Sequence, residues 1–151
     1  YLDYKIAEDG ELCMHGDSIM LGYYKDPEAT AEVIDADGWF HTGDLARKDE
    51  DGYYFLTGRK KNLIILDSGE NISPEELEGI VGKCEAVKEC VVKEMGKKIG
   101  VVVYCDEDKQ QQVRDFITEA NRTLPLYKRM SAVEFSTEPL PRNGAGKLLR
   151  Q

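Results

Sequence analysis

The sequence has 151 residues, which is long enough for one ordinary domain or two small ones. Hydrophobic residues make up 41% and charged residues 32% of the chain, a mixture typical of a folded protein and not of a disordered one. The net charge of −9 argues against a nucleic-acid-binding protein, because contact with the phosphate backbone requires a basic surface.

Further classes can be excluded from apolar runs and cysteines. No apolar run approaches the roughly 20 residues that cross a bilayer, so we expect no transmembrane segment, while peripheral contact with a membrane stays open. The four cysteines show no C-x-x-C spacing and the two histidines do not complete a zinc set, so we expect no metal site and reduced thiols in a cytoplasmic protein. The chain opens at Tyr1, not at a methionine, and has no signal peptide, which suggests a piece of a longer protein.

Charge is distributed unevenly along the chain. Residues 1–58 hold 14 acidic and 4 basic side chains, whereas residues 59–151 hold 15 acidic and 16 basic ones. The net charge of the two parts is therefore −10 and +1. We place a domain boundary at this change, between a first domain of residues 1–58 and a second of residues 59–151.

Residues 1–58 are predicted to be rich in β-structure. The segment 10–16 alternates as a strand does, and the segment after it runs into a turn marked by Pro27 and a short helix. Residues 45–48 and 53–57 then form the strands of a β-hairpin with its turn at Asp51-Gly52.

Residues 59–138 are predicted to form a compact α+β unit. Residues 62–66 have the pattern of a buried strand. Ser73 and Glu76 then make a capping box, and Pro74 suits the first position of the helix that follows. Residues at helical spacing give this helix one apolar face, namely Leu77, Ile80, Val81 and Cys84.

The second half of this unit adds two strands, a helix and a last strand. The strands 87–95 and 98–105 flank a Gly96-Lys97 turn. A second amphipathic helix ends at Pro125 and buries one face, made of Val113, Phe116, Ile117, Ala120 and Leu124. A strand at 131–136 completes an α+β fold in which we expect an antiparallel three-stranded sheet with packed helices.

Two common ligand-binding loops are excluded by spacing. A calcium loop that starts at Asp49 would need glutamate where Lys60 stands, and one that starts at Asp35 would need it at Ala46. The terminal segment "PLPRNGAGKLLR" (139–150) is not a phosphate-binding P-loop, because Leu148 follows the lysine where Ser or Thr is required.

Three features remain that can carry chemistry. In the terminal segment, prolines stiffen the approach and glycines free the backbone around Lys147, an arrangement that presents a mobile cation. Asp44 in "HTGDL", beside a tight glycine turn, can accept two hydroxyl donors as ribose-binding acids do, and Arg59 can hold the same sugar or a phosphate. "LDSGENISPEELE" (66–78) is a glycine turn that leads into a capped helix.

The order of these segments is more specific than any one of them. "GELCMHGDSIMLGYY", "GWFHTGD", "DGYYFLTGRKKNLI", "SGENISPEELE" and "PLPRNGAGKLLR" follow one another along nearly the whole chain. Together they closely resemble the carboxy-terminal motifs of the adenylate-forming superfamily, which includes acyl-CoA synthetases, peptide-synthetase adenylation domains and luciferases. The spacing in "IILDSGEN" looks more like that of long-chain fatty acid ligases.

The resemblance implies an activity and the roles of single residues. These enzymes use ATP with Mg²⁺ to turn a carboxylic acid into an acyl-adenylate, and then pass the acyl group to a thiol such as CoA. By the match, Asp44 holds the ribose hydroxyls of ATP, Arg59 assists there, and Lys147 is the catalytic lysine. Its charge offsets the negative charge that builds as the carboxylate attacks phosphorus.

The resemblance also implies a movement between the two half-reactions. Lys61 matches the hinge about which the second domain turns, so the hinge is expected near residues 59–62. Lys147 faces the nucleotide in the first half-reaction, and Ser68, Gly69 and Glu70 line the path of the pantetheine thiol in the second. Ser68 stands where many relatives have a second glycine.

The phosphate loop and acyl pocket of the family have no counterpart in these residues. We therefore expect the chain to need an amino-terminal domain and to be inactive alone, and the acid substrate stays open. Two alternatives to an acyl-CoA synthetase remain. One is an adenylation domain that loads a carrier protein, and the other is an interaction module without chemistry.

Overall fold

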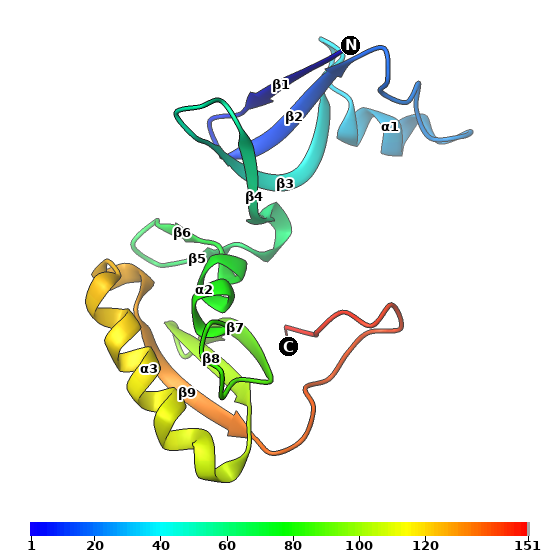
Figure 1. The fold of residues 1–151 in the computed structure, drawn as a ribbon. Helices are drawn as coiled ribbons and strands as arrows, with labels where there is room; N and C mark the ends of the chain where they lie inside the picture. Colours follow the sequence, from blue (N-terminus) through cyan, green and yellow to red (C-terminus); the bar gives the residue numbers. More distant parts are fainter. Residues whose placement is uncertain (151) are drawn as a thin grey trace. The chain divides into compact units, whose positions relative to one another are not determined.

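The computed structural model describes residues 1–150, and these divide into two compact units, Tyr1–Lys61 and Asn62–Gln151 (Figure 1). The division falls three residues after the position that the charge pattern indicated. Both units contain helices as well as antiparallel strands, so the predicted α+β class is confirmed. No helix within residues 1–150 has the length and apolar character needed to cross a membrane.

The first unit is a four-stranded antiparallel sheet with one short helix. Its strands pair in the order β1 (Leu2–Ile6), β2 (Glu11–Gly16), β3 (Phe40–Lys48) and β4 (Tyr54–Arg59). The helix α1 (Pro27–Val33) begins where predicted, because Asp26 accepts a hydrogen bond from the Ala29 N–H at 2.9 Å and Pro27 occupies the first turn.

The predicted hairpin is confirmed, but its first strand is longer than expected. β3 begins at Phe40 because residues 40 and 41 pair with β2, with Phe40 opposite Met14 and His41 opposite Cys13. Local sequence does not show such a partner. Strand β1 was not predicted at all, although Leu2 to Ile6 pair with Gly16 to Leu12.

The second unit contains a small hairpin and a three-stranded sheet with two helices. The hairpin consists of β5 (Ile64–Ile65) and β6 (Asn71–Ile72). The sheet and its helices follow as α2 (Pro74–Val81), β7 (Glu89–Met95), β8 (Lys98–Tyr104), α3 (Gln110–Thr123) and β9 (Met130–Ser136). Single 3₁₀ turns lie at Lys60–Asn62, Glu107–Lys109 and Leu126–Lys128.

The prediction of a fully antiparallel sheet is wrong. Strands β7 and β8 are antiparallel across the Gly96-Lys97 turn, where both residues have positive φ as a two-residue hairpin requires. Strand β9, however, pairs parallel to β8. The chain between them crosses the sheet through α3, and a crossover of this length returns the chain in the same direction.

Two local predictions in this unit are also wrong. Only Ile64 and Ile65 of the predicted buried strand 62–66 are extended and paired, and Ile65 is 67% exposed. Ser73 stands at the N-cap of α2, but there is no side-chain capping bond. Its hydroxyl donates to Glu75, while Glu76 pairs with Lys128 at 3.0 Å, so a distant cation replaces the expected capping box.

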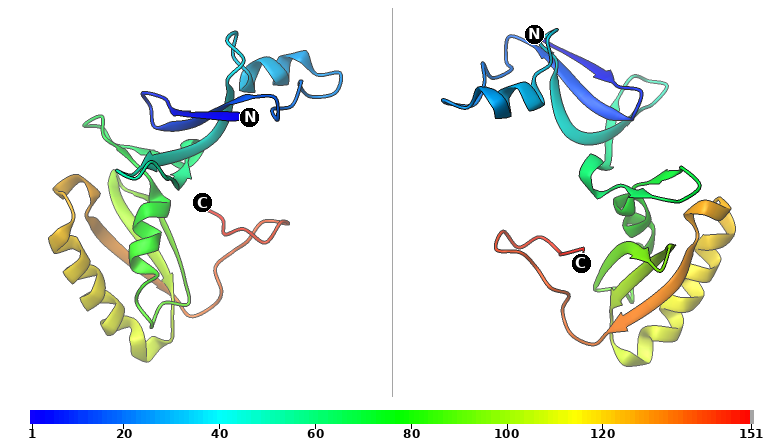
Figure 2. Two further views of the ribbon diagram at one scale, coloured as in Figure 1. Left: turned by 45° about the horizontal axis from the view of Figure 1, so that its top comes forward. Right: turned by 180° about the vertical axis from the view of Figure 1, so that it is seen from behind.

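Helices α2 and α3 cover one face of the three-stranded sheet (Figure 2). The predicted apolar faces are confirmed: Leu77, Val81, Val113 and Ile117 are all 2% exposed or less. They meet alternate residues of β8, namely Ile99, Val101 and Val103. The opposite face of the sheet presents the residues between them.

Leu77→Ala should leave a cavity in this core, because the Leu77 side chain is fully buried among α2, α3 and the sheet. We expect the free energy of unfolding to fall by about 2–5 kcal/mol. Urea denaturation followed by far-UV circular dichroism, which reports the helices, measures the change. Ile65→Ala is the control, with an expected change within about 0.5 kcal/mol because its side chain is exposed. Similar losses in both variants would contradict this assignment of the core.

Candidate functional site

Asp44 and Arg59 lie directly opposite each other on β3 and β4. The Arg59 Nε is 2.8 Å from Asp44 Oδ1, and the two side chains are 49% and 26% exposed. Gly43 before Asp44 has φ 71°, and the β3–β4 register shifts between Leu45 and Ala46. Asp44 therefore lies within an irregular strand and not in the tight turn that the sequence indicated.

A buried carboxylate, that of Glu11, lies behind this pair. Its Oε1 accepts the Gly43 N–H at 2.8 Å, and its Oε2 is 3.0 Å from both His41 Nδ1 and Lys60 Nζ. Glu11 is 4% exposed. Burial acts to raise its pKa, but the hydrogen bonds from His41, Lys60 and Gly43 outweigh burial and lower the pKa overall. Glu11 thus links Gly43, which precedes Asp44, to Lys60, which follows Arg59.

Glu11 was missed by the sequence analysis, although a signal was present. Glu11 and Cys13 share one face of β2, and both are buried. A carboxylate on the same strand face as a buried residue requires hydrogen-bond or ion-pair partners. Lys60, a cation just after the acidic first part of the chain, is a candidate partner in the sequence. The Asp9 carboxylate, 2.6 Å from Lys60 Nζ, and Glu11 together raise the pKa of Lys60 to about 12.

His41 links Glu11 to a second carboxylate. Its Nε2 is 3.3 Å from Asp35 Oδ2, and the hydrogen bond to Glu11 followed by the one to Asp35 raises the His41 pKa above the usual value, against the opposing effect of burial. The Cys13 thiol is 3.6 Å from His41 Nδ1, and burial raises its pKa. Glu11, Cys13 and His41 offer three ligand atoms within 4.8 Å of one another, and Glu11 Oε2 is at the same time 3.0 Å from the Lys60 ammonium.

Lys61 lies in an exposed 3₁₀ turn at the end of the first unit. Together with Gly43, Arg59 and Lys60 it lines a hollow of about 330 Å³. Three cations therefore line the hollow next to Gly43, and one of them, Arg59, pairs with the Asp44 carboxylate. This combination can bind a ligand that carries both hydroxyl groups and negative charge, since carboxylates accept hydroxyl hydrogen bonds and Arg and Lys attract anions.

Ser68, Gly69 and Glu70 form the turn of the β5–β6 hairpin in the second unit. The Gly69 N–H donates to Leu66 O at 2.8 Å, and the Ser68 hydroxyl donates to the Glu70 carboxylate. Gly69 has φ 94°, and an added Cβ would meet no atom of residues 1–150 within 4 Å apart from its two chain neighbours. The turn conformation itself therefore requires glycine there, whatever passes over the turn.

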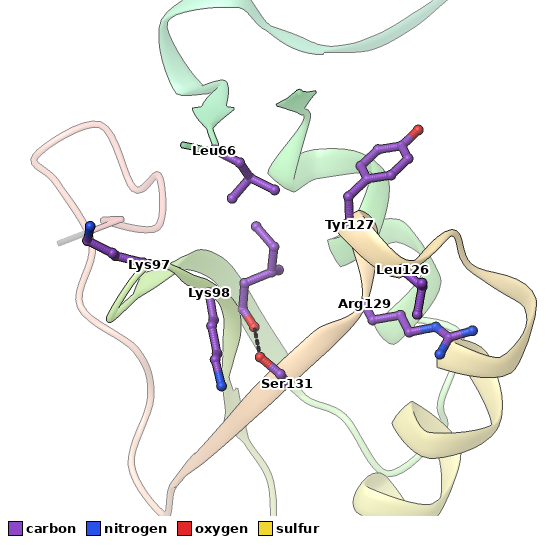
Figure 3. A pocket seen from close by; sticks show the side chains of 8 residues that line it. Leu66, Lys97, Lys98, Leu126, Tyr127, Arg129 and Ser131 are labelled. Carbon is purple, nitrogen blue, oxygen red and sulfur yellow. Dashed lines mark hydrogen bonds between the residues drawn. The ribbon is translucent and has the colours of Figure 1, made fainter. Parts of the chain in front are cut away.

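A basic pocket of about 280 Å³ lies next to this turn (Figure 3). Leu66 lines it, and so do Lys97, whose Nζ is 3.0 Å from Asp67 Oδ2, and Lys98. Leu126, Tyr127, Arg129 and Ser131 complete the labelled wall. The three cationic side chains extend from the pocket in different directions (Figure 3), with Lys97 paired to Asp67 and Arg129 Nε donating to Leu124 O at 3.2 Å. Their positive charge and the exposed Tyr127 ring are features that an anionic ligand with a flat ring can use. The sequence analysis missed this pocket because its residues come from separate segments of the chain, around Leu66, Lys98 and Arg129.

Lys147 also belongs to the second unit, where its side chain is exposed and forms no hydrogen bond or ion pair with residues 1–150. Its backbone N–H donates to Asn143 Oδ1 at 2.9 Å. The structure thus brings Asp44, Arg59 and Lys61 together in one unit. Lys147 and the Ser68–Glu70 turn belong to the other.

The raised pKa of His41 gives the first unit a pH-dependent stability. A pKa that is higher in the folded than in the unfolded state stabilises the fold fully below about pH 6.5, and this stability is lost as the pH rises through the folded pKa. Urea midpoints followed by Trp39 fluorescence should therefore fall between pH 6 and 8, and fall less in His41→Gln. His15→Gln is the matched control, because His15 lies against Trp39 and not between carboxylates. Equal slopes in the two variants would refute this assignment.

No protein-family model matches the chain. The chain is 41% identical over 149 residues to the long-chain-fatty-acid–CoA ligase of Salmonella typhimurium, a match that covers 96% of the chain and 26% of that ligase. It is 36% identical over 151 residues to probable 4-coumarate–CoA ligase 2 of Dictyostelium discoideum, which covers 97% of the chain and 27% of the relative. The chain therefore spans about a quarter of the length of these curated relatives.

The fold is similar to that of solved structures as well. The O-succinylbenzoate coenzyme A synthetase of Bacillus subtilis, in complex with ATP and a magnesium ion, matches with a TM-score of 0.79 and 28% identity. This match covers 99% of the chain and 33% of the synthetase. In sequence and in fold, the chain belongs to the adenylate-forming superfamily of acid–CoA ligases, as a portion of such an enzyme.

Proposed function

We propose that these residues are the carboxy-terminal part of an ATP-dependent, AMP-forming acid–thiol ligase, a fatty acyl-CoA synthetase. The observation that carries the proposal is the Asp44–Arg59 pair, 2.8 Å apart, beside a hollow lined by Lys60 and Lys61. The Asp44 carboxylate accepts the ribose hydroxyls of ATP, and Arg59 holds the same sugar or its phosphate. Magnesium accompanies the ATP phosphates and needs no ligand from this chain.

Lys147 supplies the charge for the first half-reaction. When the acid carboxylate attacks the α-phosphorus, negative charge accumulates on the phosphoryl oxygens. An ammonium that no carboxylate of residues 1–150 neutralises can stabilise that charge. Because Lys147 and the nucleotide-binding pair lie in different units, a turn of the second unit about Lys61 brings the lysine to the nucleotide or removes it.

The second half-reaction uses the other features of the second unit. The basic pocket at Lys98 and Arg129 holds the phosphate end of CoA, and the Tyr127 ring stacks on its adenine. The pantetheine arm then runs over the Ser68–Glu70 turn, which the pocket adjoins through Leu66 and through the Lys97–Asp67 ion pair. This pocket favours CoA over a carrier protein, because a carrier protein presents the pantetheine arm without the adenine nucleotide.

We assign a fatty acid as the substrate because the Salmonella relative, at 41% identity, is named for long-chain fatty acids. The relative named for 4-coumarate has 36% identity. Parallel assays of the enzyme with fatty acids and aryl acids discriminate between the two classes. A reducing compartment such as the cytoplasm belongs to the same proposal, since all four cysteines are free thiols.

Lys147→Ala, made in the ligase that carries this chain, should lower kcat for adenylation by about 10²–10³-fold through the loss of transition-state stabilisation. Acid-dependent pyrophosphate exchange measures this step. Thioester formation from supplied acyl-adenylate should stay within a few-fold of wild type. Lys83→Ala, which removes an exposed lysine on another segment, is the control for loss of charge. An equal loss in both half-reactions would argue against the two-conformation scheme.

Arg129→Ala should raise the KM for CoA by about 10- to 100-fold, the effect of losing one or more charge-assisted hydrogen bonds to phosphate. The KM for free pantetheine, which lacks the nucleotide phosphates, should not change. Adenylation rates should also remain unchanged, because the acid and ATP do not use this pocket. Equal effects on CoA and pantetheine would place the phosphates elsewhere.

A further inference from the structure

The two ends of the terminal segment (residues 139–150), at Leu140 and at Leu149, lie against the face of the three-stranded sheet that α2 and α3 leave open. The loop between these ends extends away from the sheet (Figure 2). β-pairing puts Val91 opposite Val102 on this face, whereas Val92 and Val101 point to the helices. Leu140, Pro141 and Leu149 line a space of about 160 Å³ over Val91 and Val102, and Leu140 is only 7% exposed. Leu140 therefore anchors the start of the segment on the domain, whereas residues 141–147 are exposed.

Within this segment, residues 142–148 close into a small hairpin (Figure 1). Arg142 and Leu148 form its bridge, and the Asn143 N–H donates to Lys147 O at 2.8 Å. The Asn143 side chain accepts the N–H groups of Ala145 and Lys147 at 3.0 and 2.9 Å. Gly146 has φ 78°, which a glycine adopts without strain. The backbone on both sides of Lys147 is thus held by hydrogen bonds.

Glu89 and Arg142 connect this hairpin to the sheet. One Arg142 nitrogen donates to Gly146 O at 2.7 Å, and another pairs with Glu89 Oε1. The second oxygen of Glu89 accepts the Leu140 N–H at 2.8 Å. Glu89 lies on β7 and is 17% exposed. One carboxylate therefore holds both the start of the terminal segment and the arginine that closes its loop, and the bond from Arg142 lowers the pKa of Glu89.

A second anchor holds the far end of the segment. The Arg150 guanidinium is 2.9 Å from Glu78 Oε2 on α2 and 3.4 Å from Glu75 Oε1. One ion pair thus holds the first residue of the hairpin, Arg142, and another holds Arg150 after it. Between them, the Lys147 side chain is exposed and forms no bond with residues 1–150. Hydrogen bonds hold the backbone of the loop, while the cationic side chain can meet a ligand.

We propose that Glu89 and Arg142 are positioning residues for Lys147, which they present on a rigid hairpin instead of a flexible tail. This inference rests on the proposed function of Lys147 in adenylation. The hairpin holds the Lys147 backbone at one position relative to the sheet. Movement of the whole domain therefore brings the ammonium group to the same place each time. Ordering the loop before the reaction removes an entropic cost from the adenylation step.

The first experiment tests the hairpin without any assumption about activity. Amide hydrogen exchange of Ala145, Gly146 and Lys147 is measured by NMR on the 151-residue protein. In Glu89→Gln these amides should exchange about ten-fold faster, and in Glu89→Ala up to about a hundred-fold faster, because charge-assisted hydrogen bonds are lost. Glu94→Gln, an exposed residue of the same strand, is the matched control and should leave their exchange unchanged.

The second experiment tests whether the hairpin serves the reaction. In the ligase that carries this chain, Glu89→Gln should lower kcat for adenylation about ten-fold or more. The KM for ATP and thioester formation from supplied acyl-adenylate should both stay near wild type. Arg142→Lys keeps the charge but loses the guanidinium fork that reaches both Gly146 and Glu89. Its kcat for adenylation should lie between those of wild type and Glu89→Ala. A purely structural role of Glu89 would lower both half-reactions together.

The outcomes are distinguishable. Faster exchange with a selective loss of adenylation supports the inference. Unchanged exchange overturns it whatever the activities are, and so does an equal loss of both half-reactions. If exchange is faster but adenylation is unaffected in Glu89→Gln and also in Lys147→Ala, the proposed role of the lysine fails and the inference fails with it. If only Lys147→Ala is impaired, positioning is refuted and the proposed function stands.

Discussion

The arrangement of the first unit depends on the buried carboxylate of Glu11, whose charge is stabilised only when all of its hydrogen-bond partners are present. A charged Glu11 withdrawn from water is costly unless donors surround it, and here the Gly43 N–H, His41 and Lys60 meet its two oxygens. These donors come from two different segments of the chain, so satisfying Glu11 also brings those segments together. The consequence is that Asp44, next to Gly43, stands opposite Arg59, next to Lys60. The geometry of the candidate nucleotide site thus follows from the requirement to neutralise a residue behind it.

The second unit uses carboxylates in a comparable way, but at its surface. Glu89 and Glu78 hold two arginines of the terminal segment, and Leu140, just before the first of them, is buried. Packing of Leu140 and Leu149 against an otherwise open sheet face positions the ends of the segment, and the two ion pairs determine how it runs between them. A segment rich in proline and glycine is thus held both by hydrogen bonds of its own backbone and by ion pairs to the domain.

Relatives named for different acids match the chain, at 41% identity for the long-chain-fatty-acid–CoA ligase and 36% for the probable 4-coumarate–CoA ligase. In our proposal, the assigned residues act on the nucleotide and on the thiol and none of them contacts the acid chain. A substitution that changes the specificity for the acid substrate can leave Asp44, Arg59 and Lys147 unchanged. Within this proposal, the fatty acid is assigned from the name of the Salmonella relative and not from a residue of this chain.

The sequence by itself determined the elements whose causes are local. Apolar spacing placed α2 and α3, the Gly96-Lys97 turn placed the β7–β8 hairpin, and the order of short motifs led to the superfamily. Only the tertiary structure decided the rest, because each missing fact joins residues far apart in the chain. Strand β9 runs parallel through a crossover, Glu11 takes Lys60 as a partner, and Glu89 holds Arg142. Local patterns carry no information about such partners, since an ion pair or a strand pairing depends on where folding brings the second residue.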